Sequence, residues 1–171
     1  VIRAGLEACD SSKVRPMLNS ASLERLDALD LVREHNAEVV ITAAGESGMP
    51  SGTAERVANA SRMVEAALEK GIPLGHLHVD PLVFPISVDK EFGLHCLDAI
   101  REIRGKYGSE IHITGGMSNV SFGIPGRKTV NGAFVTLAVE AGADGGIIDP
   151  VQFSPADIFA TDRESLGYRL A

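Results

Sequence analysis

The sequence IHITGGMSNVSF, at residues 111–122, joins a short strand pattern to a turn rich in glycine and polar residues. Apolar and polar residues alternate over positions 111–114, as in a strand that buries one face. The pair Gly115-Gly116 lets the backbone turn sharply or approach a ligand closely, and Asn119 carries donors and an acceptor on a short side chain. We therefore predict that a strand ends here at the mouth of a binding pocket.

Strand and helix patterns alternate along the chain on both sides of this segment. Short apolar or β-branched runs indicate buried strands, and apolar residues at helical spacing indicate helices. The sequence predicts strands at residues 14–18, 37–42, 77–79, 111–114 and 146–148. It predicts helices over residues 1–8, 53–70, 91–106 and 131–140, and others beginning at Ser22 and near Ser154. This alternation predicts an α/β fold, a parallel sheet covered by helices.

Two parallel architectures are compatible with the alternation. A doubly wound nucleotide-binding sheet should carry a G-x-G-x-x-G phosphate turn, and the sequence has none. A (β/α)8 barrel of the TIM type collects its functional residues at the carboxyl ends of many strands. Polar residues stand at four predicted strand ends, namely Asn19, Asp80, Asn119 and Asp149. The sequence therefore favours the barrel.

The length of the chain covers only part of such a barrel. A complete barrel has about 250 residues, whereas this chain has 171, with about five of the eight βα units. Residues 1–8 also look like the second half of a helix, because no capping residue precedes them. We therefore expect residues 1–171 to be the C-terminal part of one barrel domain, with about three βα units ahead of Val1.

Composition argues against several classes of function. A net charge of −7 disfavours nucleic acid and anionic membranes as partners, because both require a basic surface. No apolar run approaches the roughly 20 residues that cross a bilayer. Cys9 and Cys96 lie far apart without metal-binding spacing, so we expect two buried, reduced thiols in a cytoplasmic protein.

Each strand-end residue has a structural alternative to a binding role. The carboxylate of Asp80, in an Asp-Pro pair, could accept two N–H donors from the edge of an amino-pyrimidinone ring, or it could bond its own turn. Asn19 could equally begin the next helix, and Asp149 fits a strand-ending turn better than a site. Asn119 has the strongest functional pattern, because a helix cap does not need a preceding glycine pair.

Other polar residues carry weaker patterns. His76 and His78 alternate along a strand, but the sequence places no third ligand beside them, so we expect no metal site. A nucleophilic serine in a G-x-S-x-G turn is absent from the sequence. Arg127 and Lys128 could bind an anionic tail of a ligand, or they could belong to a solvated loop.

Three segments together resemble the pterin-binding family: Asn19-Ser20, HVDPL at residues 78–82, and GMSNVS at residues 116–121. Their order and spacing are similar to those of methyltetrahydrofolate:corrinoid methyltransferases and of the folate domain of cobalamin-dependent methionine synthase. The resemblance implies a pterin-binding TIM-type barrel that moves a methyl group between N5 of methyltetrahydrofolate and the cobalt of a corrinoid. It also implies that a partner protein carries the cobalamin, and that the barrel could form a homodimer.

The resemblance assigns roles to individual residues. It implies that Asn19 and Asp80 hydrogen-bond the pterin ring and that Asn119, as the catalytic residue, reaches N5. The other pterin-binding residues would be Gly116, Ser118, Ser121 and Asp149. A hydrogen bond at N5 assists transfer because a tertiary amine is a poor leaving group, and a neutral amide can follow its change of charge.

Two other functions are compatible with the resemblance. A dihydropteroate synthase, another branch of the family, should carry a basic Ser-Arg-Lys-like motif where this chain has Met117-Ser118-Asn119. A non-catalytic pterin-binding fragment is the second alternative, because a further pterin-binding Asp of the family would lie on a strand before Val1. Methyl transfer is the function that we expect.

Overall fold

The computed structural model describes residues 1–151 and the single positions 156, 160, 162 and 164. Four strands form one sheet: β1 (Met17–Ala21), β2 (Glu38–Thr42), β3 (Leu77–Asp80) and β4 (His112–Ile113). All neighbours are parallel, and the spatial order β1-β2-β3-β4 follows the order in the chain. Consecutive order is typical of a barrel, whereas a doubly wound sheet reverses its order at a switch point. The expected TIM-type architecture is therefore confirmed.

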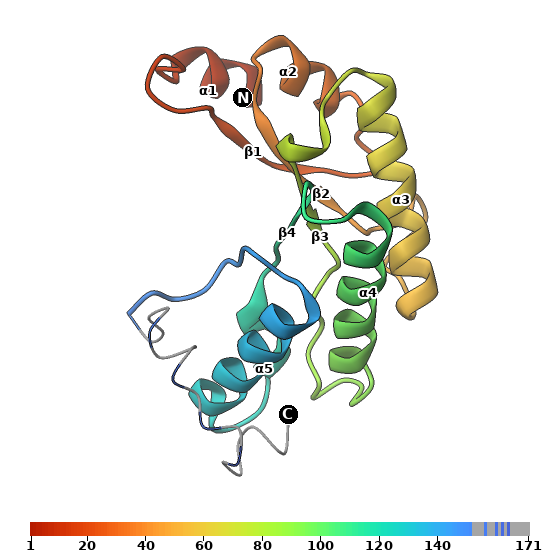
Figure 1. The fold of residues 1–171 in the computed structure, drawn as a ribbon, viewed down its shortest axis with the longest axis vertical. Coiled ribbons are helices and arrows are strands. Elements are labelled where there is room, and N and C mark those ends of the chain that lie inside the picture. Colours follow the sequence, from red (N-terminus) through yellow and green to blue (C-terminus); the bar gives the residue numbers. More distant parts are fainter. Residues whose placement is uncertain (152–155, 157–159, 161, 163, 165–171) are drawn as a thin grey trace.

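The helices are α1 (Ile2–Ala8), α2 (Ala28–Glu34), α3 (Thr53–Glu69), α4 (Phe92–Tyr107) and α5 (Arg127–Ala141), with short 3-10 turns η1 (Leu74–His76) and η2 (Met117–Ser121). Helices α2, α3 and α4 lie along one side of the strands (Figure 1), and α5 packs against α4 and η2. Gly108 and Gly142 follow α4 and α5 with φ of 71° and 118°. Glycine tolerates such positive φ, which explains why both helices end at these residues.

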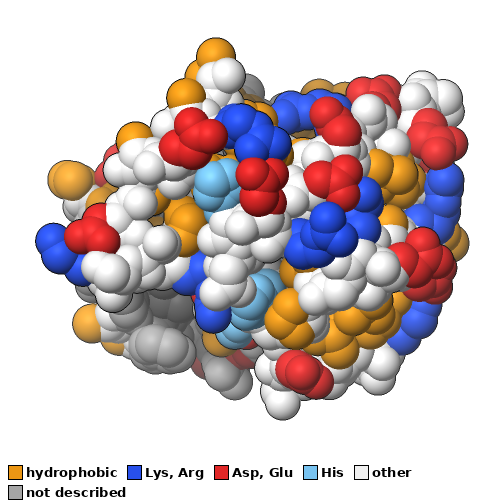
Figure 2. Space-filling model, turned by 90° about the horizontal axis from the view of Figure 1, so that it is seen from above, with side chains coloured by type: hydrophobic (Ala, Val, Ile, Leu, Met, Phe, Trp, Pro, Cys, Tyr) orange, Lys and Arg blue, Asp and Glu red, His pale blue; other side chains and the backbone are white. Residues whose placement is uncertain are grey.

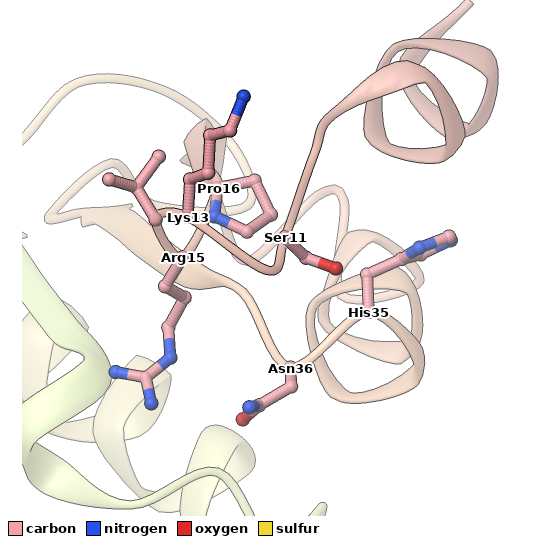
Figure 3. A pocket seen from close by; sticks show the side chains of 7 residues that line it. Ser11, Lys13, Arg15, Pro16, His35 and Asn36 are labelled. Carbon is pink, nitrogen blue, oxygen red and sulfur yellow. The ribbon is translucent and has the colours of Figure 1, made fainter.

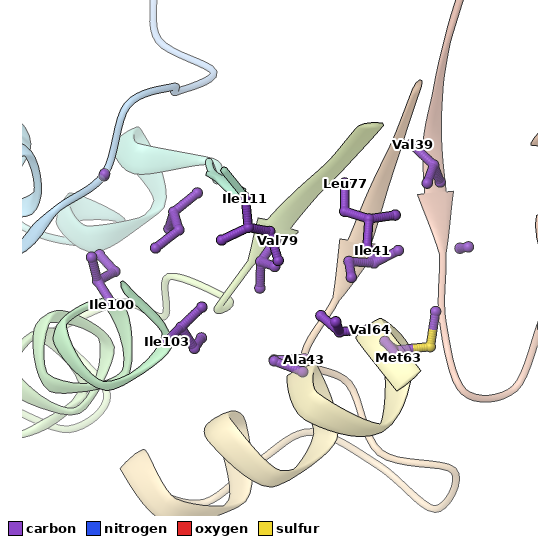
Figure 4. Packing of buried hydrophobic residues seen from close by; sticks show 14 of the residues in the cluster. Val39, Ile41, Ala43, Met63, Val64, Leu77, Val79, Ile100, Ile103 and Ile111 are labelled. Carbon is purple, nitrogen blue, oxygen red and sulfur yellow. The ribbon is translucent and has the colours of Figure 1, made fainter. Parts of the chain in front are cut away.

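The hydrophobic core lies between the sheet and helices α3 and α4 (Figure 4). Its buried side chains include Val39, Ile41, Leu77 and Val79 from the strands, and Met63, Val64, Ile100 and Ile103 from the helices. Successive strand residues point to opposite faces of a sheet. The residues that alternate with this set, among them His78 and Asp80, therefore face away from the helices.

The surface seen from above mixes acidic and basic side chains rather than gathering one sign of charge on that face (Figure 2). Among the described residues, no helix combines the length and the apolar content that crossing a membrane requires.

Three elements begin three or more residues away from the predicted position. β1 begins at Met17 rather than at residue 14, because Pro16 has no N–H to donate to a strand ladder. The helix expected from Ser22 begins only at Ala28. The residues between them form tighter i→i+3 turns, in which the Ser22 carbonyl accepts the Arg25 N–H at 2.8 Å. Helix α5 begins at Arg127, earlier than expected, directly after a left-handed glycine.

The strand expected at residues 146–148 is not formed. Asp144 and Gly145 both donate their N–H groups to the carbonyl of Ile113, at 3.2 and 3.0 Å, and Ile147 donates to Gly115 at 2.8 Å. Two donors on one carbonyl interrupt the even spacing of a parallel ladder. The segment therefore runs beside β4 without becoming a strand. The helix expected near Ser154 begins outside the described residues.

The two cysteines differ in their environments. Cys96 is buried on α4, as expected, but Cys9 is exposed. The prediction for Cys9 is wrong because Leu6 alone is buried in α1, so this helix does not cover the residue that follows it.

Candidate functional site

Asp80 is the last residue of β3 and begins the turn that leaves the sheet. It pairs with Thr42 of β2, and its carbonyl accepts the N–H of Ala43 at 2.9 Å. Its Oδ1 accepts the N–H of Leu82 at 2.8 Å. Asp80 therefore makes the hydrogen bond to its own turn that was the structural alternative to a binding role, but this bond occupies only one of its two carboxylate oxygens. Within the described part of the chain Leu82 is the hydrogen-bond partner of this carboxylate, so Oδ2 is available to a ligand.

Burial shapes the chemistry of this carboxyl group. It raises the pKa of Asp80 from 3.8 to about 6, against the lowering effect of the Leu82 N–H. A ligand that presents N–H donors to the carboxylate would favour the ionised form. Asp80 is therefore suited to accept hydrogen bonds from a ring edge that supplies two donors.

The glycine pair makes room for two functional side chains. A Cβ atom on Gly115 would lie 2.9 Å from Oδ1 of Asp80, and one on Gly116 would lie 2.9 Å from Nδ2 of Asn119. Both distances are shorter than van der Waals contact, so any larger residue would displace these side chains. Two adjacent glycines thus allow Asp80 and Asn119 to lie against the same short segment, as the sequence motif at residues 115–119 predicts.

Gly115→Ala should destabilise the fold by about 1–3 kcal/mol, because the Asp80 carboxylate that it would strike is held by a hydrogen bond. Gly105→Ala is the matched control, since a Cβ at this position of α4 has no neighbour within 4 Å. That variant should gain about 0.5–1 kcal/mol from helix propensity. Urea unfolding measures both, and equal stability of the two variants would contradict the packing seen around Gly115.

Asn119 lies in the 3-10 turn η2 and is exposed. The N–H of Asn119 bonds the carbonyl of Gly116 at 3.0 Å, and its own carbonyl accepts the N–H of Phe122 at 3.1 Å. The backbone of this residue is therefore fixed on both sides. Nδ2 of its side-chain amide lies beside Gly116, where it could donate a hydrogen bond to a ligand.

Ser121 and Arg127 hold this turn in place. Ser121 is fully buried, and its hydroxyl donates to the carbonyl of Ser118 at 3.3 Å and accepts from Nε of Arg127 at 2.9 Å. Arg127 also donates to the Ser118 carbonyl at 3.1 Å and lies 4.6 Å from the ring centroid of Phe122. The sequence did not predict that Arg127 stabilises this turn, because its side chain reaches Ser118 and Ser121 only after the loop between them has folded.

Asn19 is not at a strand end. It lies inside β1, where it pairs with Val40 of β2, and the register shifts between Asn19 and Ala21. Val40 in turn pairs with His78, so Asn19 lies level with His78 rather than with Asp80. The prediction that Asn19 follows the end of a strand is wrong, because β1 begins later than the apolar run at residues 14–18 and continues past Asn19 to Ala21.

Asp149 is half-buried and follows the segment that does not form a strand. Its Oδ1 accepts the N–H of Val151 at 2.9 Å. This is the same i→i+2 turn bond that Asp80 makes to Leu82, and it confirms the turn expected for this residue.

Histidine side chains form a polar row on the sheet face that Asp80 shares. Nε2 of His78 lies 2.9 Å from Oε2 of Glu38, and the His78 and His112 rings are stacked with centroids 4.7 Å apart. Nδ1 of His112 lies 3.0 Å from Oδ2 of Asp144. Each imidazole therefore has its own carboxylate. No set of three or more metal-ligating side chains with metal-site geometry occurs among the described residues.

A cavity of about 250 Å³ lies at the opposite end of the strands, beside the residues that precede β1 and β2. It is lined by Ser11, Lys13, Val14, Arg15, Pro16, His35 and Asn36. The charged ends of Lys13 and Arg15 point in opposite directions (Figure 3). They do not converge on a ligand, so the region of Asp80 and Asn119 is the stronger candidate site.

Sequence comparisons identify the family of this chain. A family model described as "Pterin binding enzyme" matches residues 1–149. The chain belongs to the pterin-binding enzymes. This is a TIM-barrel family, of which the four parallel strands of this pterin-binding chain form a part. The resemblance carried by the three motifs is therefore confirmed.

Two curated relatives of the pterin-binding chain have names that state an activity. The methylcorrinoid:tetrahydrofolate methyltransferase of Eubacterium limosum is 36% identical over 126 residues, covering 73% of this chain and 46% of the relative. The methionine synthase of Mycobacterium leprae (strain TN) is 29% identical over 170 residues, covering 91% of this chain and 14% of the relative. The chain thus spans less than half the length of either relative.

Proposed function

We propose that the protein transfers a methyl group between N5 of methyltetrahydrofolate and the cobalt of a corrinoid carried by a partner protein. The names of the two relatives support this reaction. The observation that carries the proposal is the convergence of half-buried Asp80 and exposed Asn119 on the adjacent glycines Gly115 and Gly116. One group is suited to bind a ring edge, and the other to act on a nearby ring nitrogen.

Asp80 would hold the pterin by its amino-pyrimidinone edge. This edge offers two neighbouring N–H donors, which match Oδ2 and the lone pair of Oδ1 that the Leu82 N–H leaves open. Because burial raises the pKa of this carboxyl to about 6, the unliganded group is partly protonated below neutral pH. The N–H donors of the pterin would stabilise the ionised form of Asp80, and this pairing would fix the orientation of the ring as well as increase its affinity.

Asn119 would act at N5, the atom that carries the methyl group. When the N5–methyl bond breaks, its electron pair stays on N5 and takes a proton from solvent, which gives the N–H of tetrahydrofolate; an amide N–H placed there can stabilise that pair as it develops. In the reverse direction N5 returns this proton to solvent as the same electron pair bonds the incoming methyl group. An exposed position suits this role, because the methyl group must remain accessible to a second protein.

The other expected pterin-binding residues have different degrees of support. Gly116 has direct geometric support, because it gives the Asn119 amide its space. Ser118 and Ser121 would act through the shape of the turn, since the Ser118 carbonyl and the Ser121 hydroxyl are bonded to Arg127. Asn19 and Asp149 are proposed as pterin-binding residues from the resemblance alone. Asn19 would act from a position level with His78, farther inside the sheet than Asp80.

The corrinoid, when bound to its partner protein, supplies the cobalt that takes or gives the methyl group. The described part of this chain would contribute positioning and polarisation of the folate. A cytoplasmic location and a homodimer stay predictions.

Stopped-flow spectroscopy tests the reaction. Mixing the protein with methyltetrahydrofolate and a Co(I) corrinoid should convert the Co(I) spectrum to that of methylcob(III)alamin at a rate that depends on protein concentration. Calorimetry with methyltetrahydrofolate alone should show binding before any transfer. Folate binding without methylcobalamin formation would contradict the methyltransferase proposal and favour the non-catalytic alternative. Formation of dihydropteroate from a pterin diphosphate and p-aminobenzoate would favour the synthase alternative.

A further inference from the structure

Arg56 is a buried cation in the first turns of α3, with no exposed surface. No carboxylate forms an ion pair with it within the described ranges. Its Nε is also buried without a hydrogen-bond partner in that part of the chain. Burial accordingly lowers the pKa of Arg56. A desolvated charge of this kind is costly, and the folded state retains it only if its contacts compensate.

The contacts of Arg56 join two strand-end loops. One guanidinium nitrogen donates to the carbonyl of Gly52, in the loop between β2 and α3, at 3.1 Å. The other donates to the carbonyl of Leu82, in the loop between β3 and α4, at 3.5 Å. The guanidinium also lies 4.7 Å from the ring centroid of Phe84 in the second loop. Arg56 therefore fixes the segment that directly follows Asp80.

Leu82 has an unusual backbone conformation. Its φ is 67°, in the left-handed region that a bulky side chain rarely occupies. In this conformation its N–H donates to Oδ1 of Asp80 at 2.8 Å, while its carbonyl receives Arg56. The two groups of one residue thus link the buried guanidinium to the pterin-binding carboxylate.

We propose that Arg56 is a positioning residue for Asp80: it holds Leu82 in the left-handed conformation that directs the Leu82 N–H at the carboxylate. The guanidinium does not touch the carboxylate itself and acts through the backbone of one residue. The consequence for folate rests on the proposed function, whereas the consequence for the ionisation of Asp80 does not.

Few other titratable groups lie near this link. Cys96 of α4 is close enough to interact with both Arg56 and Asp80, and burial raises the pKa of its thiol to about 12, so it stays neutral. Glu55 is the neighbour of Arg56 in α3 and is exposed, with its carboxylate bonded to Ser51. The Leu82 N–H is therefore the contact through which Arg56 can change the titration of Asp80.

The test measures the Asp80 carboxyl by carbon NMR in the ligand-free protein. Arg56→Met keeps the length of the side chain but removes its donors and charge. The pKa of Asp80 should rise by about one pH unit, because the Leu82 N–H no longer favours the carboxylate. Methyltetrahydrofolate affinity, measured by calorimetry on the same samples at neutral pH, should fall about 10-fold. Arg56→Lys should give an intermediate result, because lysine can reach one carbonyl but not hold both.

Two further variants separate positioning from general destabilisation. Arg62→Met, at an exposed position of α3 where Arg62 pairs with Glu46, is the matched control and should change neither quantity. Adding Leu82→Gly to Arg56→Met should return the Asp80 pKa toward the value of the unmutated protein. Glycine adopts positive φ without strain, so the left-handed conformation no longer requires the guanidinium.

The outcomes are distinguishable. An unchanged Asp80 titration in Arg56→Met and Arg56→Lys would overturn the inference, even if folate affinity falls. If the unmutated protein does not bind folate but the titration shifts as expected, the proposed function fails and the positioning role stands. If neither variant folds, the same question can be put to the unmutated protein by NMR. The Leu82 amide proton and the Arg56 guanidinium protons should exchange slowly with solvent, and their chemical shifts should change with pH in step with the Asp80 titration. Rapidly exchanging guanidinium protons that ignore this titration would overturn the proposal.

Discussion

Asn119→Ala is expected to slow methyl transfer by about 100- to 1000-fold, the range seen when one donor that stabilises developing charge is removed. Folate affinity should fall much less, because the substitution leaves unchanged the ring edge that Asp80 is proposed to bind. The reason is chemical: the electron pair left on N5 develops only as the methyl group departs, so a donor at N5 stabilises the transition state more than the bound substrate. Single-turnover stopped-flow rates at saturating folate measure the loss directly.

Asn119→Asp sharpens this experiment. The substitution keeps the size of the side chain and its acceptor oxygens but removes the N–H donors, so it should be as slow as the alanine variant. Asn36→Asp is the matched control, since Asn36 is an exposed asparagine that precedes β2 at the opposite end of the sheet. Fast transfer by Asn119→Asp would exclude donation from the amide as the source of the rate.

Asp80→Asn is expected to weaken methyltetrahydrofolate binding by about 10- to 100-fold, because two charge-assisted hydrogen bonds become neutral and one amide N–H faces the donors of the pterin. The same variant should be more stable than the unmutated protein at pH 7. The carboxyl has a pKa of about 6 in the folded state against an ordinary value of 3.8. Folding therefore favours the protonated form, and the stability that this group contributes is complete below pH 4 and is lost as pH rises through about 6.

The size of this loss follows from the two pKa values, and it is about 3 kcal/mol above pH 6. Because asparagine cannot ionise, Asp80→Asn should recover about 1–3 kcal/mol at pH 7 and flatten the fall in stability between pH 4 and 6. Asp89→Asn is the matched control, since Asp89 makes the same i→i+2 turn bond, to Glu91, at an exposed position. Denaturant unfolding across this pH range gives the result. A variant less stable than the unmutated protein at pH 7 would show that burial does not disfavour the Asp80 carboxylate.

The strands that are buried on the helix side could be predicted closely from sequence. The apolar runs of β2 and β3 match the structure within a residue or two, because their alternate side chains must fill the core under α3 and α4. The predictions failed at the edges of the sheet. There the chain near β1 and residues 146–148 has one neighbour in the sheet, and the details of hydrogen bonding decide whether a strand forms.

Some features of the candidate site could be predicted from the sequence, and others could not. The placement of Asp80 at a strand end and of Asn119 in the turn after β4 could be predicted because local patterns, an Asp-Pro pair and a glycine pair, mark where the backbone leaves the sheet, whereas their roles in a site stay predictions. The clamp from Arg127 to Ser121 and the link from Arg56 to Leu82 could not, because both join segments that are brought together only by folding. Arg56 in particular has the sequence surroundings of an ordinary helix residue, and burial alone distinguishes it from Arg62.

The pair Gly115-Gly116 also affects the chain before it folds. Glycine has more accessible backbone conformations than any other residue, so ordering each one costs roughly 1 kcal/mol more than ordering alanine. Two adjacent glycines therefore place a local entropic penalty at the segment beside which both Asp80 and Asn119 lie. A side chain at Gly115 would lower that penalty by roughly 1 kcal/mol, but its clash with the Asp80 carboxylate would offset this gain, so the folded chain carries the entropic cost of glycine as a condition of the site.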